Sequence, residues 1–190
     1  MNFLAHAYLA GQDADFLTGN LIADAVTAAA YKQMPAVIQA GINHHRNVDK
    51  YTDTHPLVAD CRLLFFSHIR HYAAVIVDVL FDHYLAKHWH LYHPLPLEAY
   101  EQTIYHILDK RAYLFSEKFV FMYSRMKAHR WLSQYQHLTY IRQTIENLNK
   151  RTPLFTQSAI TIKVFDEQYD EIEKLFFAFF KDLSTQYKVA

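Results

Sequence analysis

Residues 73–85 run Ala73-Ala-Val-Ile-Val-Asp78-Val-Leu-Phe-Asp82-His83-Tyr-Leu85, and this is among the most apolar stretches of the chain. Asp78 and Asp82 are four residues apart, so on a helix they share one face. Two like charges at that spacing repel, and burying either one without a partner is costly or forces protonation. The stretch predicts a buried helix whose two carboxylates need positive charge beside them.

A second ladder of ligand-type side chains lies upstream, where His45, Asp49 and Asp53 follow one another in steps of four. A divalent cation would account for both ladders, because it takes carboxylate and imidazole ligands and removes the repulsion between the acids. Two simpler explanations stay open. The upstream ladder fits a solvated helix face with surface ion pairs, and the buried acids fit partners such as an arginine or a helix terminus.

Two further residues add to this pattern. Asp24 closes the run Gly19-Asn-Leu-Ile-Ala-Asp24, and His6 lies in the apolar N-terminal segment. Either one alone is as compatible with a hydrogen-bonded core residue as with a ligand. Together with the two ladders they exceed what one core normally satisfies. A ligand set of mostly carboxylates with a few histidines favours Mn²⁺, Mg²⁺ or Fe²⁺ over Zn²⁺.

Composition excludes several classes of protein. The 190 residues fit one domain, expected to span 1–190, and 19 basic against 19 acidic residues give no footprint for nucleic acid. With three glycines, the chain has no cluster that could form a P-loop or a dinucleotide fingerprint. Gly-x-Ser-x-Gly, His-Glu-x-x-His and Cys-x-x-Cys motifs are also missing.

The cysteine content and the hydropathy of the chain indicate in which cellular compartment it is expected. Cys61 is the single cysteine, so an intrachain disulfide is impossible and a reducing compartment suits the chain. The first residues lack the features of a signal peptide, and no window is long and apolar enough to span a membrane. The expected location is the cytoplasm. The sequence leaves the oligomeric state open.

Hydrophobic periodicity is helical along nearly the whole chain. Helices are expected at about 14–30, 35–53, 56–70, 72–90, 97–109, 112–127 and 129–149, with a last one starting near Asp166. Asp13 or Asp15 is the expected N-cap of the first, and Gly19 is expected to allow close packing inside it. Residues 151–159 are the best loop candidate, and 160–164 are a weak candidate for a short strand. These expectations indicate an all-α, single-domain, multi-helix bundle.

Five blocks of sequence carry the two ladders together with His6 and Asp24. They are Met1-Asn-Phe-Leu-Ala-His6, Gly19-Asn-Leu-Ile-Ala-Asp24, Gly41-Ile-Asn-His-His45-Arg-Asn-Val-Asp49, Thr52-Asp53-Thr-His-Pro56 and Asp78-Val-Leu-Phe-Asp82-His83-Tyr-Leu85. In residues, order and spacing, these blocks together resemble the bacterial acyl carrier protein phosphodiesterases. The likeness spans nearly the whole chain and is strong up to about Trp89.

The resemblance implies a helical fold distantly related to the HD-domain metal phosphohydrolases. It also implies hydrolysis of the phosphodiester that joins 4′-phosphopantetheine to a serine of acyl carrier protein, with Mn²⁺ or a similar ion. Positions that match the family pattern are His6, Asp24, His45, Arg46, Asp49, Asp53, Asp78, Asp82 and His83. One departure follows Asp24. There the family has an aromatic residue and then a basic residue followed by glycine, and this chain has Ala25-Val-Thr-Ala-Ala-Ala30.

These matches give a working hypothesis for the site. Divalent metal is expected on Asp24, His45, Asp49, Asp53, Asp78 and Asp82. His83 or His6 is expected to assist the leaving serine oxygen, and Arg46 to neutralise charge on the phosphoryl group. A basic patch is expected to steer the small acidic carrier protein to the site, formed by Lys32, Arg46, Lys50 and Arg70.

Two other functions stay open at this point. One is a related phosphohydrolase acting on a nucleotide or another small phosphoester, to which the departure after Asp24 gives weight. The other is a catalytically silent helical protein whose acids only store metal or organise the core.

Overall fold

The computed structural model describes residues 3–151 and 157–189, and within those ranges it contains helices and no strand. The all-α prediction is therefore confirmed. The α-helices are α1 (Phe3–Leu9), α2 (Ala14–Ile22), α3 (Ala28–Gln33), α4 (Ala36–Thr54), α5 (Pro56–Ile69), α6 (Tyr72–Lys87), α7 (Leu97–Asp109), α8 (Glu117–Ala128), α9 (Trp131–Gln134), α10 (Leu138–Arg151), α11 (Ser158–Glu167) and α12 (Tyr169–Tyr187). Short 3₁₀ turns are η1 (Ala23–Ala25), η2 (Trp89–Leu91) and η3 (Ala112–Leu114).

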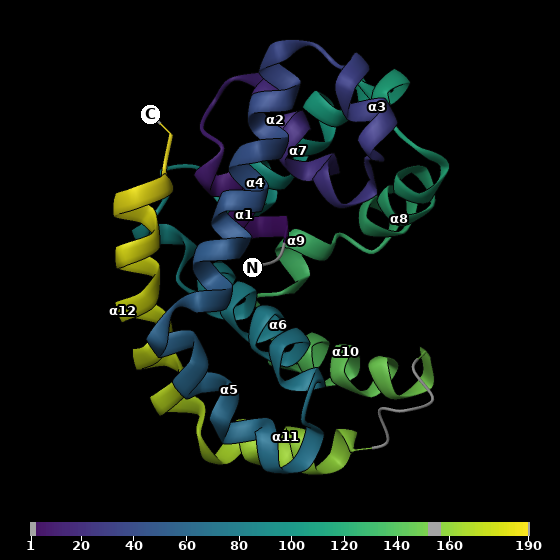
Figure 1. Ribbon diagram of the computed structural model, residues 1–190. Helices are drawn as coiled ribbons and strands as arrows, with labels where there is room; N and C mark the ends of the chain where they lie inside the picture. The colour runs from purple at the N-terminus through teal and green to yellow at the C-terminus, as the bar shows by residue number, and fades with distance from the viewer. Residues whose placement is uncertain (1–2, 152–156, 190) are drawn as a thin grey trace.

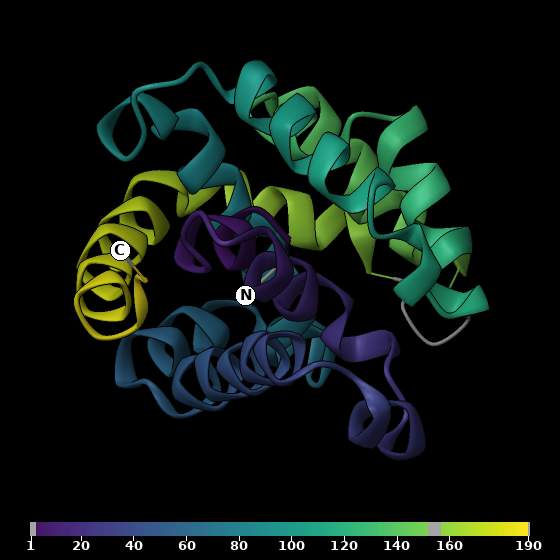
Figure 2. The same cartoon turned by 90° about the horizontal axis from the view of Figure 1, so that it is seen from above.

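Helix α6 is the buried helix that residues 73–85 predict. It packs against α1, α5, α10 and α12 (Figure 1). Ile76, Leu80 and Phe81 have no exposed surface, since neighbouring helices cover several sides of the helix. Seen from above, α1 lies near the middle of the molecule, with α12 on one side and α4 and α5 on another (Figure 2). The N-terminal segment is thereby enclosed by elements from distant parts of the chain.

Helices α2 and α4 pack closely against each other, and glycines permit it. A Cβ atom on Gly19 would lie 2.2 Å from the carbonyl oxygen of Ile38, and one on Gly41 would lie 2.1 Å from that of Phe16. Asp13 caps α2 by accepting hydrogen bonds from the backbone amides of Asp15 and Phe16. The predictions for Asp13 and Gly19 are both confirmed.

Other boundaries differ from those expected. The predicted helix 14–30 is broken, because Val26 is extended and Thr27 accepts a hydrogen bond from the Ala30 amide to start α3.

The strand proposed for 160–164 is wrong, since these residues belong to α11. Arg130, with a φ of 49°, separates α8 from α9. The last helix is α12, which starts at Tyr169. Helix α1 was not predicted, and part of the predicted loop 151–159 lies outside the described residues.

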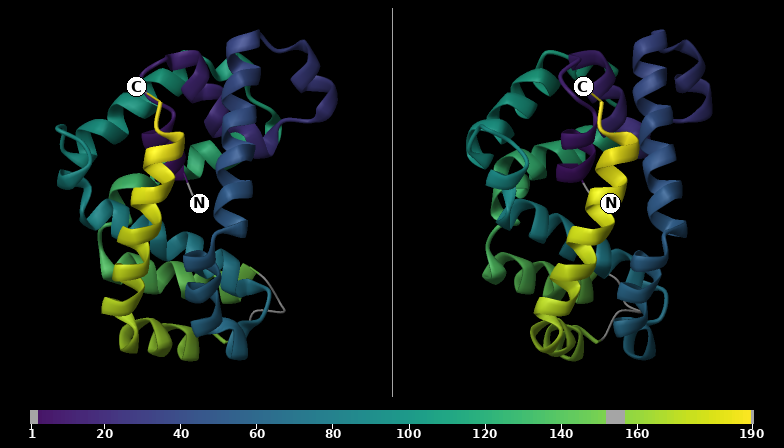
Figure 3. Two further views of the ribbon diagram at one scale, coloured as in Figure 1. Left: turned by 60° about the vertical axis from the view of Figure 1, so that its left-hand side comes forward. Right: turned by 90° about the vertical axis from the view of Figure 1, so that its left-hand side faces the viewer.

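Helix α12 closes one side of the fold and runs beside α4 (Figure 3). Its inward face is aromatic, and Phe176, Phe179 and Phe180 are fully buried. These rings supply much of the apolar area that stabilises the bundle. None of the described helices combines the length and the hydropathy that crossing a membrane would require.

Candidate metal centre

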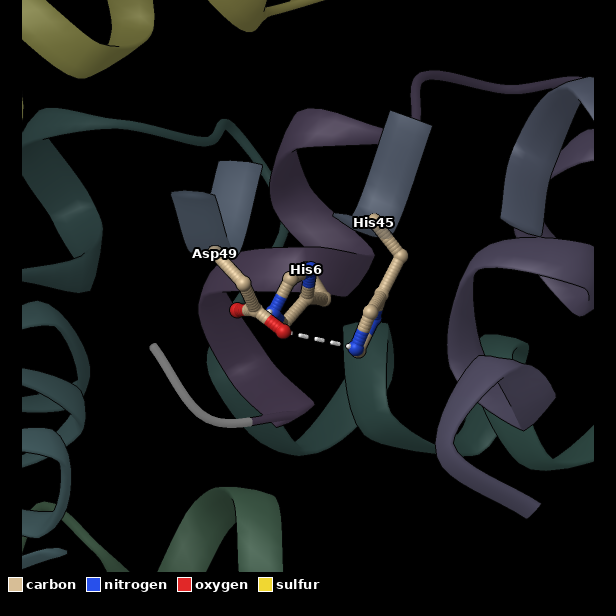
Figure 4. A group of neighbouring side chains, drawn as sticks. All are labelled: His6, His45 and Asp49. Carbon is tan, nitrogen blue, oxygen red and sulfur yellow. Dashed lines mark hydrogen bonds and ion pairs between the residues drawn. The ribbon is translucent and has the colours of Figure 1, made fainter. Parts of the chain in front are cut away.

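Three side chains from two helices meet at the middle of the fold. His6 comes from α1, and His45 and Asp49 come from α4, where their spacing of four puts them on one face. One ligand atom from each lies within 4.8 Å of the other two (Figure 4). The Nε2 atom of His6 lies 3.1 Å from Oδ1 of Asp49, and the Nε2 atom of His45 lies 3.0 Å from Oδ2. Asp49 therefore bridges the two imidazoles.

Asp24 joins this group from the η1 turn. Its Oδ1 atom lies 3.3 Å from Nε2 of His45, and its side chain is the most exposed of the four. The break of the predicted helix 14–30 at residues 23–27 places this carboxylate at the edge of the cluster instead of along a helix face. Hereafter the cluster means His6, Asp24, His45 and Asp49. It offers two nitrogen and two carboxylate donors beside solvent.

Helix α1 is held in place from both ends, which positions His6. Asp82, fully buried on α6, accepts a hydrogen bond of 3.0 Å from the backbone amide of Leu4. A carboxylate at a helix N-terminus is favourable, because it meets unsatisfied amides and the positive end of the helix dipole. At the other end the Val189 amide donates to the Leu9 carbonyl, and Lys188 donates to the Tyr8 hydroxyl. Asp82 was predicted as a metal ligand, and the structure places it at this anchor.

Burial and ion pairing together set the protonation states of the cluster. Burial lowers the pKa of His6 to about 4, so its ring is neutral near pH 7. Burial would also lower the pKa of His45, but Asp24 and Asp49 raise it to about 9. Burial would raise the pKa of Asp49, but its contacts with His45 and His6 hold it well below the ordinary value. Positive charge at this point is therefore strongly favoured.

The donor set fits a divalent ion. The rings of His6 and His45 stack with centroids 3.8 Å apart, and both are buried. Their Nδ1 atoms are buried and have no hydrogen-bond partner among the described residues. Two imidazoles and two carboxylates suit Mn²⁺ or Fe²⁺ among the first-row metals, with Mg²⁺ favoured less by the nitrogens.

Two other predicted ligands lie outside this group. Asp78 is partly buried on α6, and burial raises the pKa of its carboxyl. The charges of Asp49 and Arg62 both act on it, which puts it within electrostatic reach of the cluster. Asp53 lies exposed at the end of α4, where Arg62 of α5 donates to its Oδ1 at 2.7 Å. The upstream ladder thus divides, with His45 and Asp49 in the cluster and Asp53 in an ion pair.

His83, predicted as a proton donor, belongs to the core on another face of α6. Its Nδ1 lies 2.7 Å from the carbonyl oxygen of Tyr135, and its Nε2 lies 2.9 Å from the hydroxyl of Tyr169. Burial lowers the pKa of His83 to about 4. With both nitrogens engaged, the ring joins α6 to the segment after α9 and to α12.

The predicted basic patch is spread over three helices. Lys32 is exposed on α3, Arg46 and Lys50 are exposed on α4, and Arg70 caps the C-terminal end of α5 with a φ of 48°. The guanidinium of Arg46 stacks over the ring of Tyr31, 5.2 Å from its centroid. Arg46 therefore extends along the surface between α3 and α4.

Sequence reasoning missed one cation at the cluster. Lys118 of α8 donates a hydrogen bond of 3.1 Å to the backbone carbonyl of Asp24. The two residues are 94 positions apart and share no periodic pattern, so no signal in the sequence links them. Only the packing of η1 against α8 brings this ammonium group to the edge of the cluster.

Comparisons with known proteins agree with the resemblance. A family model described as acyl carrier protein phosphodiesterase matches residues 1–183. Among curated relatives with that same name, one from Yersinia pestis is 34% identical, and the match covers 98% of this chain and 97% of the relative. One from Photorhabdus laumondii is 33% identical over 95% and 91%. One from Escherichia coli K12 is 30% identical over 98% and 97%. No solved structure matches this chain.

Proposed function

The chain belongs to the acyl carrier protein phosphodiesterase family, and on that premise we propose that it releases 4′-phosphopantetheine from acyl carrier protein. The bond hydrolysed is the phosphodiester to a serine of the carrier protein, and the products are apo carrier protein and free 4′-phosphopantetheine. The observation that carries the proposal is the cluster, where two imidazoles and two carboxylates converge at an edge open to solvent.

Metal dependence is part of the proposal. His6, Asp24, His45 and Asp49 would hold the divalent ion, because the ring of His6 is neutral and the carboxylate of Asp49 is ionised, as ligands require. His45, whose pKa Asp24 and Asp49 raise to about 9, would release its proton when the ion binds. When bound, such an ion polarises a phosphoryl oxygen and lowers the pKa of water. Mn²⁺ is the ion we propose first, since the donors are mixed nitrogen and oxygen.

The side chains around the cluster have separate tasks in this scheme. Asp82 holds α1 and thereby the His6 ring, and the backbone carbonyl of Asp24 holds Lys118. The ammonium group of Lys118 supplies positive charge on the side where a phosphoryl group would enter. The lowered pKa of His6 favours a ligand role over the proton-donor role first expected for it. Asp78 interacts with Asp49 by charge from α6.

The test is mass spectrometry of holo carrier protein incubated with the purified protein and Mn²⁺. We expect conversion to the apo form, with release of 4′-phosphopantetheine, and loss of conversion in excess EDTA. Parallel incubation with nucleotides separates this reaction from that of a general phosphohydrolase. Unchanged carrier protein with hydrolysed nucleotides would contradict the proposal, and full conversion after exhaustive chelation would contradict its metal dependence. Location in the cytoplasm stays a prediction from the single cysteine.

A further inference from the structure

A small pocket lies between the segment that follows Asp24 and the segment that begins α8. Its volume is about 180 Å³. One wall is built from Ala25, Ala30 and Met34, and the facing wall from Phe115 and Phe119. The pocket exists because the run after Asp24 carries small side chains, so that α3 and α8 leave space between them.

Both walls of the pocket continue from residues at the edge of the cluster. Ala25 follows Asp24 directly in the η1 turn. On the facing wall, Phe119 follows Lys118, whose ammonium group is bonded to the Asp24 carbonyl. The lining of the pocket therefore begins one residue after Asp24 on one wall and one residue after Lys118 on the other.

The lining of the pocket is apolar in effect. Thr27 and Ser116 contribute the two hydroxyl groups, and each is the N-cap of its helix. The Thr27 hydroxyl accepts from the Ala30 amide, and the Ser116 hydroxyl accepts from the Phe119 amide. Both oxygens accept these bonds, and the other lining side chains are aliphatic, thioether or aromatic. An apolar pocket of this size suits a small hydrocarbon group.

We propose that this pocket receives the gem-dimethyl carbon of the pantoyl unit of 4′-phosphopantetheine. The inference rests on the proposed function and names the part of the substrate that lies beside the reacting phosphate. In 4′-phosphopantetheine the dimethyl-bearing carbon is bonded to the CH₂ that carries the phosphate ester. With the phosphate at the cluster, the two methyl groups would lie on the side of Asp24 where the pocket begins, and their burial there would favour binding. In this proposal the chain recognises 4′-phosphopantetheine partly through the two methyl groups beside its phosphate.

Filling the pocket tests the proposal. Ala30→Leu extends a side chain into the pocket, and Ala29→Leu is the matched control, because Ala29 is exposed and does not line it. We expect Ala30→Leu to weaken binding of free 4′-phosphopantetheine roughly tenfold or more by titration calorimetry, and Ala29→Leu to leave it unchanged. Binding of inorganic phosphate, and hydrolysis of bis(p-nitrophenyl) phosphate with Mn²⁺, should be the same in both variants. Ala30→Val replaces Ala30→Leu if the latter does not fold.

The measurements separate failure of the pocket assignment from failure of the proposed function. Equal weakening for inorganic phosphate would mean that the substitution disturbs the cluster, which would overturn the pocket assignment. Discrimination only against acylated carrier protein would assign the pocket to a fatty acyl chain and also overturn it. If the native chain binds 4′-phosphopantetheine through the pocket and yet leaves holo carrier protein intact, the proposed function fails while the pocket assignment stands.

Discussion

At the scale of single residues, spacing of four does not by itself make two acids equivalent. Asp49 and Asp53 lie one step apart on α4, yet the first bridges two imidazoles and the second is bonded to Arg62 at the surface. A residue four positions further along a helix is rotated by about 40° beyond a full turn. Side chains at successive steps of four therefore point in increasingly different directions. The neighbours offered by α1 and α5 then decide which acid serves the cluster.

Removing each charge in turn separates these two roles. We expect Asp49→Asn to lower the rate of apo carrier protein formation roughly a hundredfold or more, because a ligand charge is lost. Asp53→Asn should stay within about threefold of the native rate, because exposed ion pairs contribute at most about 1 kcal/mol. The measurement is the mass-spectrometric time course at saturating Mn²⁺. Comparable losses in the two variants would refute this division of the ladder.

His83 makes the stability of the protein depend on pH. Its pKa in the folded protein is about 4, against an ordinary value of 6.5. Between these values the unfolded chain binds a proton at this residue and the folded protein does not, so acidification favours unfolding. We expect the free energy of unfolding to fall as the pH drops from about 6.5 to about 4, with His83 contributing at most about 1.4 kcal/mol per pH unit.

Urea denaturation across that pH range measures this contribution. His83→Gln should flatten the slope by up to about one proton, because glutamine does not titrate. His90→Gln, at an exposed position, is the matched control and should keep the native slope. Identical slopes in all three proteins would show that His83 is not protected from protonation.

At the scale of elements, the pairing of α2 with α4 positions the cluster. Gly19 and Gly41 let the two backbones approach, and η1, which follows α2, then brings Asp24 to His45 on α4. The distance between Asp24 and His45 depends on how α2 and α4 pack, and neither helix alone determines it. The glycine contact therefore contributes to the geometry of the cluster as well as to stability.

A methyl group at Gly41 should disrupt this pairing. The added Cβ of Gly41→Ala would lie 2.1 Å from the Phe16 carbonyl oxygen and 2.9 Å from the Asn20 amide nitrogen, so the helices must separate. We expect a loss of roughly 2 kcal/mol or more in the free energy of unfolding, despite the higher helix propensity of alanine. Asn47→Ala, at an exposed position of α4, should change stability by less than about 0.5 kcal/mol. Chemical denaturation tests both, and a stabilised Gly41→Ala protein would refute the contact.

At the scale of the whole molecule, the cluster joins segments that are far apart in sequence. His6 on α1 and Asp49 on α4 meet directly, and α1 is in turn fixed by α6 and by Val189 after α12. A ligand that binds the cluster stabilises all of these contacts together, because the unfolded chain does not present them at one point.

Metal binding should therefore raise the melting temperature. At a free Mn²⁺ concentration of 100 times Kd, the added stability is about 2.7 kcal/mol, which for a chain of this size corresponds to roughly 5–10 °C. Differential scanning fluorimetry with and without Mn²⁺ measures the shift. Asp49→Asn should show little shift and Asp53→Asn the native one. A native protein that is indifferent to Mn²⁺, Mg²⁺ and Fe²⁺ alike would contradict the metal centre.

The local sequence pattern was enough to predict the helical class and the buried helix at the centre of the fold. Apolar residues at helical period, without glycine clusters or strand alternation, leave little alternative to helices. Helix formation and the burial of one helix face depend on residues a few positions apart, and hydrophobic periodicity reveals both.

Only the tertiary structure decided the membership of the cluster. Asp82 became the cap of α1, His83 became a link between core helices, and Lys118 reached Asp24 across 94 positions. Periodicity states which side of a helix a residue occupies, and it contains no information about which distant helix faces that side. That choice follows from packing of the whole chain, because burial energies are summed over all helices at once.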